Sequence, residues 1–395
     1  MSYRERMQRL ELLLGEAVIN LEQLKELVFH GLPGDGSARP LVWRLLLNYL
    51  PASREEWGPF LAKKRTNYGN FVADLLQPCC AAEEAADAAE EADHPLNPNP
   101  DSRWQQFFRD NEVLLQIDKD VRRLLPEIAF FQSATKYPCE QIVSGAMARL
   151  HERVGYVSLQ AGSIVKRGIG LITKTSTGTS SSSSDGGCRP NNKGGESHWE
   201  VVERILFVYA KLNPGQSYVQ GMNEIMGPLY YVLATDADEE WARWAEADTF
   251  YIFTHLMGEV RDFFIRSLDN STSGIRRMME ILMRRVGGRD TQVARLLAQQ
   301  EIHPQYYAFR WITLLLSQEF PLPDVLRIWD SLLADRKRFD FLVDLCCAMI
   351  IHVRGELLSG DFATNMKLLQ NYPPIDVRDI LALASTFSEK GVVAE

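Results

Sequence analysis

The chain has 395 residues, of which 46% are hydrophobic and 24% are charged, the composition of a globular protein with ample apolar surface for a core. Its formal net charge is −9 and its isoelectric point is about 5.5. No global field therefore favours a phosphate backbone, which excludes nucleic acid as the expected main partner.

Apolar residues recur at spacings of three and four through most of the chain, as is typical of helices with one buried face. The pattern begins as a single stripe over residues 4–28 and continues at residues 41–50, 104–125, 198–212, 250–268, 275–285, 306–317 and 339–358. No alternating strand-turn-strand series is present, so the predicted fold class is all-α. Three tryptophans are predicted to lie in the core, because aromatic residues at helical spacing usually pack: Trp43, Trp311 and Trp329.

Two segments of low complexity interrupt the helical pattern. Residues 81–93 carry six acidic side chains and no basic one; they form either an exposed helix or, the reading we favour, part of a solvated linker over residues 81–100. Residues 173–197 are rich in Ser and Gly and offer nothing to bury. Both are interpreted as loops that interrupt one helical domain.

The cysteines and the apolar segments predict a cytoplasmic protein. The six cysteines show neither the spacing of a zinc site nor that of a disulfide framework: Cys79, Cys80, Cys139, Cys188, Cys346 and Cys347. The N-terminal segment is charged and amphipathic, unlike a signal peptide. The most apolar stretch, residues 339–353, is shorter than the roughly 20 residues of a membrane span and contains two aspartates. No transmembrane segment is expected.

The sequence lacks the motifs of common enzyme classes. It contains no H-E-x-x-H zinc motif, no G-x-S-x-G nucleophile elbow, no kinase glycine loop and no G-x-G-x-x-G dinucleotide motif. A scattered histidine such as His255 within a helical stripe is interpreted as a core residue. We therefore expect neither a metal nor a cofactor bound by the chain itself.

Two short segments are polar where the surrounding helices do not require it. Residues 117–123 fit I-x-x-D-x-x-R, and residues 218–223 fit Y-x-Q-G-M-N directly after an Asn-Pro-Gly turn. The first alone could be a solvated helix face, with Asp120 and Arg123 forming an ordinary surface pair three residues apart. The second alone could be a helix entry in which Gly221 permits close backbone approach.

Taken together and in this order, the two segments resemble the TBC family of Rab GTPase-activating proteins. The arginine motif supplies Ile117, Asp120 and Arg123; the glutamine motif supplies Tyr218, Gln220, Gly221, Met222 and Asn223. Further matches are Gly31-Leu32-Pro33, the R-P-L-V-W-R-L-L run at residues 39–46, Arg103-Trp104, F-R-W-I at residues 309–312 and D-V-L-R-I-W-D at residues 324–330. The resemblance covers residues 27–335.

The resemblance implies that Arg123 acts as an arginine finger and Gln220 as a glutamine finger in the active site of a GTP-bound Rab. A forked guanidinium suits the negative charge that develops on the phosphoryl group, and a carboxamide can both donate to and accept from the attacking water. Asp120 could orient Arg123, while Tyr218 packs or bonds nearby. Arg122 is the competing finger, but the motif register selects Arg123.

The expected architecture is a helical flank at residues 1–26, a subdomain with both fingers at residues 27–235 and a second helical subdomain at residues 236–395. The chain would complete the active site of its partner without hydrolysing nucleotide itself, since GTP and Mg²⁺ come with the Rab. Its place would be vesicle trafficking, with recruitment to endomembranes through the Rab. The family often has T-x-P after the motif arginine, whereas this chain has Leu124-Leu125-Pro126, which keeps only the proline.

Two other functions stay open at this point. One is a TBC-type module that binds a GTPase without accelerating hydrolysis, which a missing finger residue would indicate. The other is a helical scaffold in which the motif matches are accidental, and it leaves their shared order unexplained.

Overall fold

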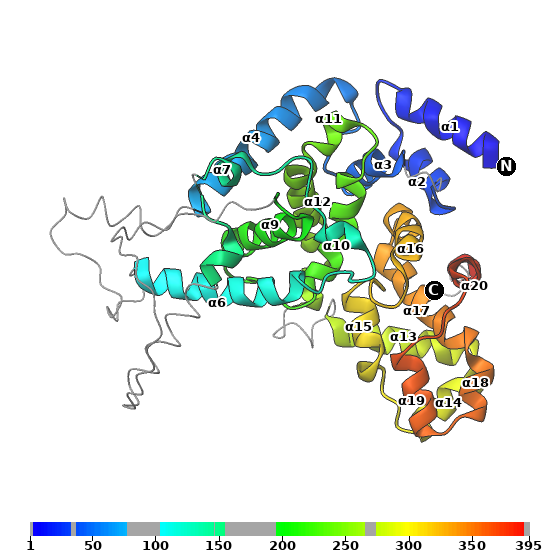
Figure 1. Cartoon of the computed structure of the whole chain (residues 1–395). Helices are drawn as coiled ribbons and strands as arrows, with labels where there is room; N and C mark the ends of the chain where they lie inside the picture. The colour runs from blue at the N-terminus through cyan, green and yellow to red at the C-terminus, as the bar shows by residue number, and fades with distance from the viewer. Residues whose placement is uncertain are drawn as a thin grey trace, which may run out of the picture. The chain divides into compact units, whose positions relative to one another are not determined.

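The computed structural model describes residues 3–32, 37–76, 103–145, 147–154, 195–264 and 274–390 (Figure 1). Over these ranges the chain forms helices and no β-strand; the only extended pairings there are two isolated bridges, Val18 with Ser53 and Ala134 with Ser197. The all-α prediction is confirmed. Within the same ranges no helix is long and apolar enough to cross a membrane. The predicted acidic loop at residues 81–100 lies outside the described residues.

The chain divides into two compact units. One comprises residues 1–68 and 224–395, and the other comprises residues 69–223. Two helices run across the division, α4 (Trp57–Leu75) and α10 (Met222–Ala234). The subdomain limits expected from the sequence, at residues 26 and 235, stay a prediction.

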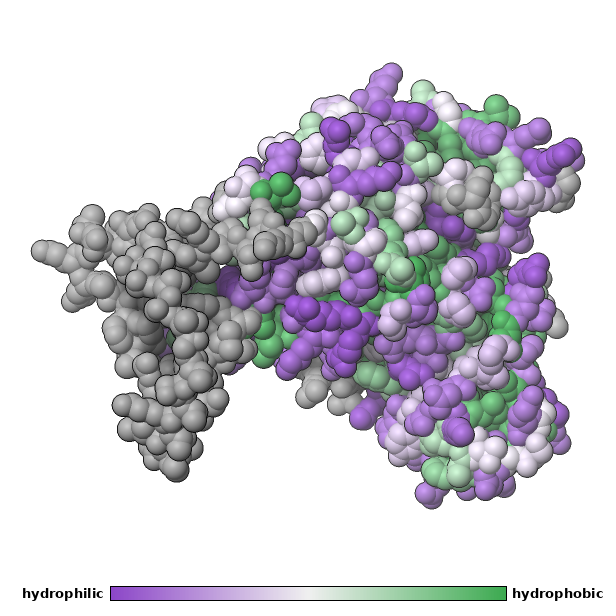
Figure 2. All heavy atoms as spheres, viewed as in Figure 1, coloured by the Kyte–Doolittle hydropathy of each residue, from purple (hydrophilic) through white to green (hydrophobic). Residues whose placement is uncertain are grey.

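The discontinuous unit holds most of the helices, and its core surrounds α17, on which α13 and α20 pack. Residues 341–350 of α17 are all buried, so the most apolar stretch of the sequence is a core helix. Trp43, Trp311 and Trp329 are fully buried, as predicted. Polar side chains cover much of the visible surface of these helices, with hydrophobic residues in small groups (Figure 2). The helices of this unit are α1 (Tyr3–Gly15), α2 (Leu21–Phe29), α3 (Arg39–Leu46), α11 (Glu239–Ala242), α12 (Ala245–Val260), α13 (Ile275–Arg289), α14 (Thr291–Gln299), α15 (Ala308–Thr313), α16 (Leu322–Ala334), α17 (Arg338–His352), α18 (Arg354–Ser359), α19 (Phe362–Gln370) and α20 (Val377–Lys390).

The single apolar stripe predicted over residues 4–28 is two helices in the structure. The side chain of Asn20 accepts hydrogen bonds from the backbone N–H groups of Glu22 and Gln23, at 3.1 and 3.2 Å, and so starts α2 afresh. Just before it, Val18 pairs with Ser53. An N-cap of this kind satisfies helix donors that would otherwise lack partners, and it overrides the continuous apolar spacing.

A buried carboxylate joins the two chain segments of this unit. Asp330 accepts from both Nε and Nη2 of Arg39 at 2.9 and 3.0 Å, from the Trp43 indole at 3.0 Å and from the Leu32 backbone at 3.1 Å. It is completely buried. The two sequence runs at residues 39–46 and 324–330, which the family resemblance singled out, are therefore structural partners.

A second buried carboxylate, Asp248, plays the same part on α12. It accepts from Arg44 Nε at 3.1 Å, from the Tyr49 hydroxyl at 2.8 Å and from Nε and Nη2 of Arg65 at 3.1 and 3.0 Å. Removing one partner of such a buried ion pair strongly destabilises the fold, because the other charge is left buried and unpaired.

The continuous unit consists of α6 (Arg103–Val121), a 3₁₀ turn (Ala129–Gln132), α7 (Glu140–Val143), α9 (His198–Leu212) and the last part of α4. Helices α6 and α9 pack along their length. Contacts at opposite ends show that they run antiparallel: Lys211 Nζ lies 2.7 Å from Asp110, and the Arg122 guanidinium lies over the Trp199 ring.

Residues 195–197, the end of the loop predicted at residues 173–197, lie outside any helix, but the expectation that this segment buries nothing is wrong for Glu196. Glu196 is 2% exposed, pairs with Arg204 and accepts from the Cys139 backbone at 2.8 Å. Ser197 and Glu200 form a capping box that starts α9. Helix α9 begins at His198, as the sequence pattern predicts, and the Ser/Gly-rich composition concealed only the buried carboxylate just before it. Residues 173–194 lie outside the described residues.

Candidate functional site

The arginine motif lies at the end of α6, within the continuous unit. Ile117 and Asp120 are on the helix; the former is fully buried and the latter is 9% exposed. Arg123 follows in the turn after Val121, and its side chain is 73% exposed. Its Nε donates to the Lys119 carbonyl at 3.0 Å and its Nη2 to Asp120 Oδ1 at 3.2 Å. The guanidinium thus keeps donors available to a partner.

The neighbouring Arg122 is held differently. Its Nε donates to Asp118 Oδ1 at 2.8 Å, and its guanidinium carbon lies 4.5 Å from the centre of the Trp199 ring. Side-chain exposure is 47%, against 73% for Arg123. Of these two arginines, Arg123, which the motif register selects, is the more accessible.

The glutamine motif lies between α9 and α10, in the same unit. Gln220 is exposed and stands in the turn that immediately precedes α10. Gly221 has φ of +101°, a conformation that glycine adopts without strain. Met222 is fully buried, and its sulfur lies 3.4 Å from the Val219 backbone nitrogen. The buried Met222 anchors this turn and Gly221 permits its backbone conformation, so the Gln220 carboxamide is held at the surface.

Asp120 joins the two motifs. The hydroxyl of Tyr218 donates to Asp120 Oδ2 at 2.8 Å and lies 3.2 Å from Asn223 Oδ1. Asn223 Nδ2 reaches the Asp120 carbonyl at 3.4 Å. Tyr218 and Asn223 are 6% and 3% exposed. One carboxylate therefore contacts Arg123 through one oxygen and, through the other, the tyrosine two residues before Gln220.

Arg103 and Trp104 are not brought to this place. They lie in the first turn of α6, whereas Asp120 lies in its last. At 1.5 Å per residue, 17 residues of helix correspond to about 25 Å. These two residues belong to the opposite end of the helix.

Sequence reasoning missed the residues around Arg122. Trp199 is 8% exposed at the start of α9, and Glu203 lies one turn later, 1% exposed. Burial, reinforced by the nearby Asp118 charge, raises the pKa of the Glu203 carboxyl well above its ordinary value. The only sequence signal was a charged residue within an apolar helical stripe, which gave no hint of a partner on another helix.

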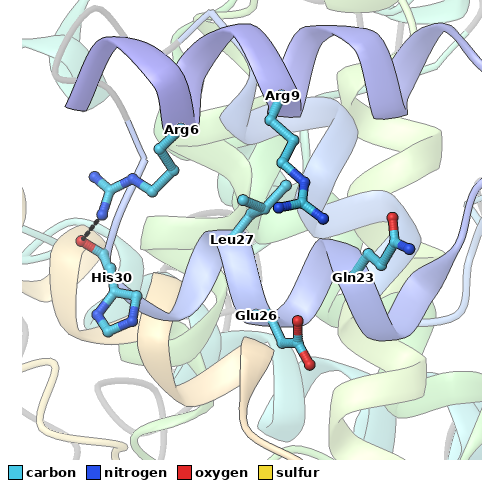
Figure 3. A pocket seen from close by; sticks show the side chains of 6 residues that line it. All are labelled: Arg6, Arg9, Gln23, Glu26, Leu27 and His30. Atoms are coloured by element: carbon cyan, nitrogen blue, oxygen red, sulfur yellow. Dashed lines mark hydrogen bonds between the residues drawn. The ribbon is translucent and has the colours of Figure 1, made fainter. Parts of the chain in front are cut away.

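A polar pocket of about 420 Å³ lies elsewhere, between α1 and α2 of the discontinuous unit (Figure 3). Arg6 donates to the His30 carbonyl at 3.3 Å across it. Burial, followed by the charges of Arg6 and Arg327, lowers the pKa of His30. The pocket contains none of the motif residues. Over the described residues, no group of three or more His, Cys, Asp or Glu side chains could hold a metal ion.

Comparison with known proteins places the chain in a family. The Rab-GTPase-TBC domain matches residues 189–358, which include Gln220. TBC1 domain family member 13 of Homo sapiens is 52% identical over 95% of this chain and 96% of its own length. A TBC domain-containing protein of Schizosaccharomyces pombe is 36% identical over 97% of this chain and 72% of its own length.

Among solved structures, the Ypt/Rab-GAP domain of Gyp1p superposes with a TM-score of 0.67 at 21% identity, and each chain is covered completely. That likeness is one of fold. The identity and mutual coverage with the human relative go further: the chain belongs to the TBC-domain family of Rab GTPase-activating proteins.

Proposed function

We propose that this chain accelerates GTP hydrolysis by a GTP-bound Rab, with Arg123 and Gln220 both entering the GTPase active site. The observation that carries the proposal is the bridge through Asp120, which ties the two motifs together while both functional side chains stay exposed. An ordinary surface pair would explain Arg123 alone, but it would not explain a buried connection to the glutamine motif.

Arg123 supplies positive charge where hydrolysis develops negative charge. Donors that already point outward stabilise the transition state without reorganising, and an arginine supplied in trans is worth about 10³–10⁵ in rate. The Lys119 carbonyl accepts from Nε and Asp120 Oδ1 from Nη2, so the Nη1 donors and the second hydrogen of Nη2 can meet the phosphoryl oxygens. Lysine would lose the planar fork.

Gln220 orients the attacking water in this proposal. Its amide can donate to the phosphoryl side and accept from the water, the task that a GTPase otherwise gives to its own glutamine. Gly221 and the buried Met222 fix the turn that carries it. GTP and Mg²⁺ arrive with the Rab, the chain needs no cofactor of its own, and it acts in the cytoplasm or on endomembranes to which the Rab recruits it.

Single-turnover hydrolysis tests this in four combinations of activator and Rab. The parent chain and Gln220→Ala are each assayed with a normal Rab and with a Rab whose own glutamine is replaced by leucine. We expect the parent to stimulate both Rabs and Gln220→Ala to stimulate neither. If Gln220→Ala remains active and stimulation depends wholly on the glutamine of the Rab, Arg123 is the only finger.

A module that binds a GTPase without accelerating hydrolysis would bind a Rab of the panel and stimulate phosphate release from none. Phosphate release at catalytic amounts of the chain, across a panel of GTP-loaded Rabs, separates this alternative from the proposal and also identifies the substrate.

A further inference from the structure

The turn that carries Arg123 is held on two sides. Asp120 restrains it toward the glutamine motif, and Arg122 restrains it toward α9 through Trp199. Arg122 and Arg123 lie beyond the last residue of α6, and their backbone N–H groups bond back to the carbonyls of Asp118 and Asp120 at 3.2 Å each. The side-chain contacts of Arg122 add to these backbone bonds and to the burial of Leu124 in fixing the turn.

Trp199 is itself held firmly. The His151 ring lies 5.2 Å from it at an interplanar angle of 55°, and His151 Nδ1 is 3.1 Å from a Glu200 oxygen. Arg149 Nη1 donates to both Glu200 oxygens, at 2.9 and 3.1 Å. Glu200 also closes the capping box of α9. The indole face that Arg122 covers is thus a fixed surface and not a loose contact.

Asp118 holds the same guanidinium from α6. Burial and the nearby Asp118 charge raise the pKa of the buried Glu203 carboxyl well above its ordinary value. Asp118 is the carboxylate that pairs with Arg122, at 2.8 Å. The Asp118 carboxylate bonds to the edge of the Arg122 guanidinium, and the Trp199 ring packs on its face. Together these contacts fix its orientation as well as its position.

We propose that Trp199 and Asp118 are positioning residues: by clamping Arg122 they hold the turn in the geometry from which Arg123 reaches the phosphoryl group. This rests on the proposed role of Arg123. Because a near-attack geometry is sensitive to displacements of about an ångström, loosening the clamp lowers kcat and leaves KM largely unchanged. The expected loss is about 3- to 10-fold, far less than the loss from removing Arg123 itself.

The variants are Arg122→Gln, Trp199→Phe and Trp199→Leu, with Arg295→Gln as control. The control removes the same charge from an exposed position on α14 in the other unit. Single-turnover kcat and KM are measured with a Rab that the parent stimulates, together with the thermal midpoint. We expect Arg122→Gln and Trp199→Leu each to lower kcat, Trp199→Phe to retain more of it, and the Arg122→Gln, Trp199→Leu double variant to lose no more than either single one.

A purely structural role for Trp199 would lower the thermal midpoint but leave kcat per folded molecule intact. An effect of Arg122→Gln on KM alone would make Arg122 a contact for the partner, and strictly additive losses would show that the two residues act separately. Any of these outcomes overturns the proposal. Arg122→Gln changes a half-exposed side chain, so folding does not confound it.

A readout without any Rab separates this proposal from the finger mechanism. In the free chain, the NMR signal of the Arg123 side-chain Nε–H should broaden or shift in Trp199→Leu. It should stay in place in Arg295→Gln. If the signal responds while the parent chain stimulates no Rab, the clamp holds and the finger proposal fails. If Arg123→Ala abolishes stimulation while neither the signal nor kcat responds to Trp199→Leu, the clamp proposal alone fails.

Discussion

Arginine and aspartate pair in both compact units, and they do opposite work there. In the discontinuous unit Arg44 is fully buried and bonds to two carboxylates, Asp236 and Asp248. In the continuous unit Arg123 meets Asp120 through one nitrogen and leaves 73% of its side chain in solvent. The same two residue types stabilise a core in one case and leave an exposed guanidinium in the other. The difference lies in how many guanidinium donors bond to carboxylates.

The largest expected effect falls on activity and separates the two arginines. Arg123→Ala should reduce stimulation of Rab GTP hydrolysis by about 10³-fold or more, because the transition-state charge loses its partner. Its free energy of unfolding should change by less than about 0.5 kcal/mol, as for other exposed sites. Single-turnover hydrolysis and denaturant unfolding measure the two quantities. Arg44→Ala should do the reverse; if both variants lost stability alike, the comparison would fail.

The next effect falls on stability alone. Asp330→Ala leaves Arg39 without its carboxylate and the Trp43 and Leu32 donors without an acceptor. Breaking a buried pair of this kind costs about 3–5 kcal/mol, which denaturant unfolding would show. The control is Glu22→Gln: this carboxylate is exposed, as is its partner Arg336, its partner Lys25 is half-buried, and its loss should cost at most about 1 kcal/mol.

A pH effect should follow from His198. Burial against Phe130, whose ring lies 4.0 Å away, lowers the pKa of His198 to about 4 from an ordinary value of 6.5. Between these values the unfolded chain binds a proton that the folded chain does not, so acidification from about pH 6.5 to 4 favours unfolding, by at most about 3 kcal/mol. His198→Phe should flatten this part of the stability profile and leave stability above pH 7 much less affected. An unchanged slope in urea titrations at several pH values would exclude His198 as its source.

A smaller effect is expected at Gly31. Its φ is +90°, and a Cβ there would lie 2.4 Å from Arg327 Nε. Because Arg327 is bonded to Ser331 at 2.7 Å, it cannot yield freely. Gly31→Ala should lower the free energy of unfolding by about 1–3 kcal/mol. Gly58→Ala on α4 meets no atom within 4 Å and should be neutral or slightly stabilising, which makes it the matched comparison in the same thermal scan.

The smallest effect tests the boundary of the Ser/Gly-rich segment. Replacing residues 173–194 by a short Gly/Ser linker should leave the thermal midpoint nearly unchanged, because loop closure entropy varies slowly with length. Extending the replacement through Glu196 and Ser197 should lower the midpoint, since it removes a buried carboxylate and the cap of α9. Equal thermal midpoints for the two replacements would show that residues 195–197 are as dispensable as the rest of the loop.

Much of the fold was predictable because apolar periodicity is a local property. The helix over residues 198–212 and the burial of Trp43, Trp311 and Trp329 came directly from it. The break before Asn20 was not predictable in this way, because a polar cap restarts the helix there against the continuous apolar spacing. Helix α9 begins where the periodicity predicts, but the burial of Glu196 just before it was not predictable from the Ser/Gly-rich composition.

The candidate site shows a similar limit. The motifs name Arg123, Gln220, Asp120 and Tyr218, but only the folded chain shows that Asp120 contacts both Arg123 and Tyr218, from 98 residues away in the case of the tyrosine. Trp199 escaped attention because nothing in its own neighbourhood marks it. Its partner lies on another helix, and pairings across helices leave no periodic trace in a sequence.

The bond between Leu32 and Asp330 spans 298 residues and has a consequence for the chain as it is synthesised. At a translation rate of about 5–20 residues per second, Arg39, Trp43 and Leu32 wait roughly 15–60 s for the carboxylate that will bind them. Residues 69–223, by contrast, are contiguous and can assemble as soon as they emerge from the ribosome. During that interval the N-terminal segment lacks the carboxylate that joins it to the rest of its unit, so this unit is completed only after α16 is translated.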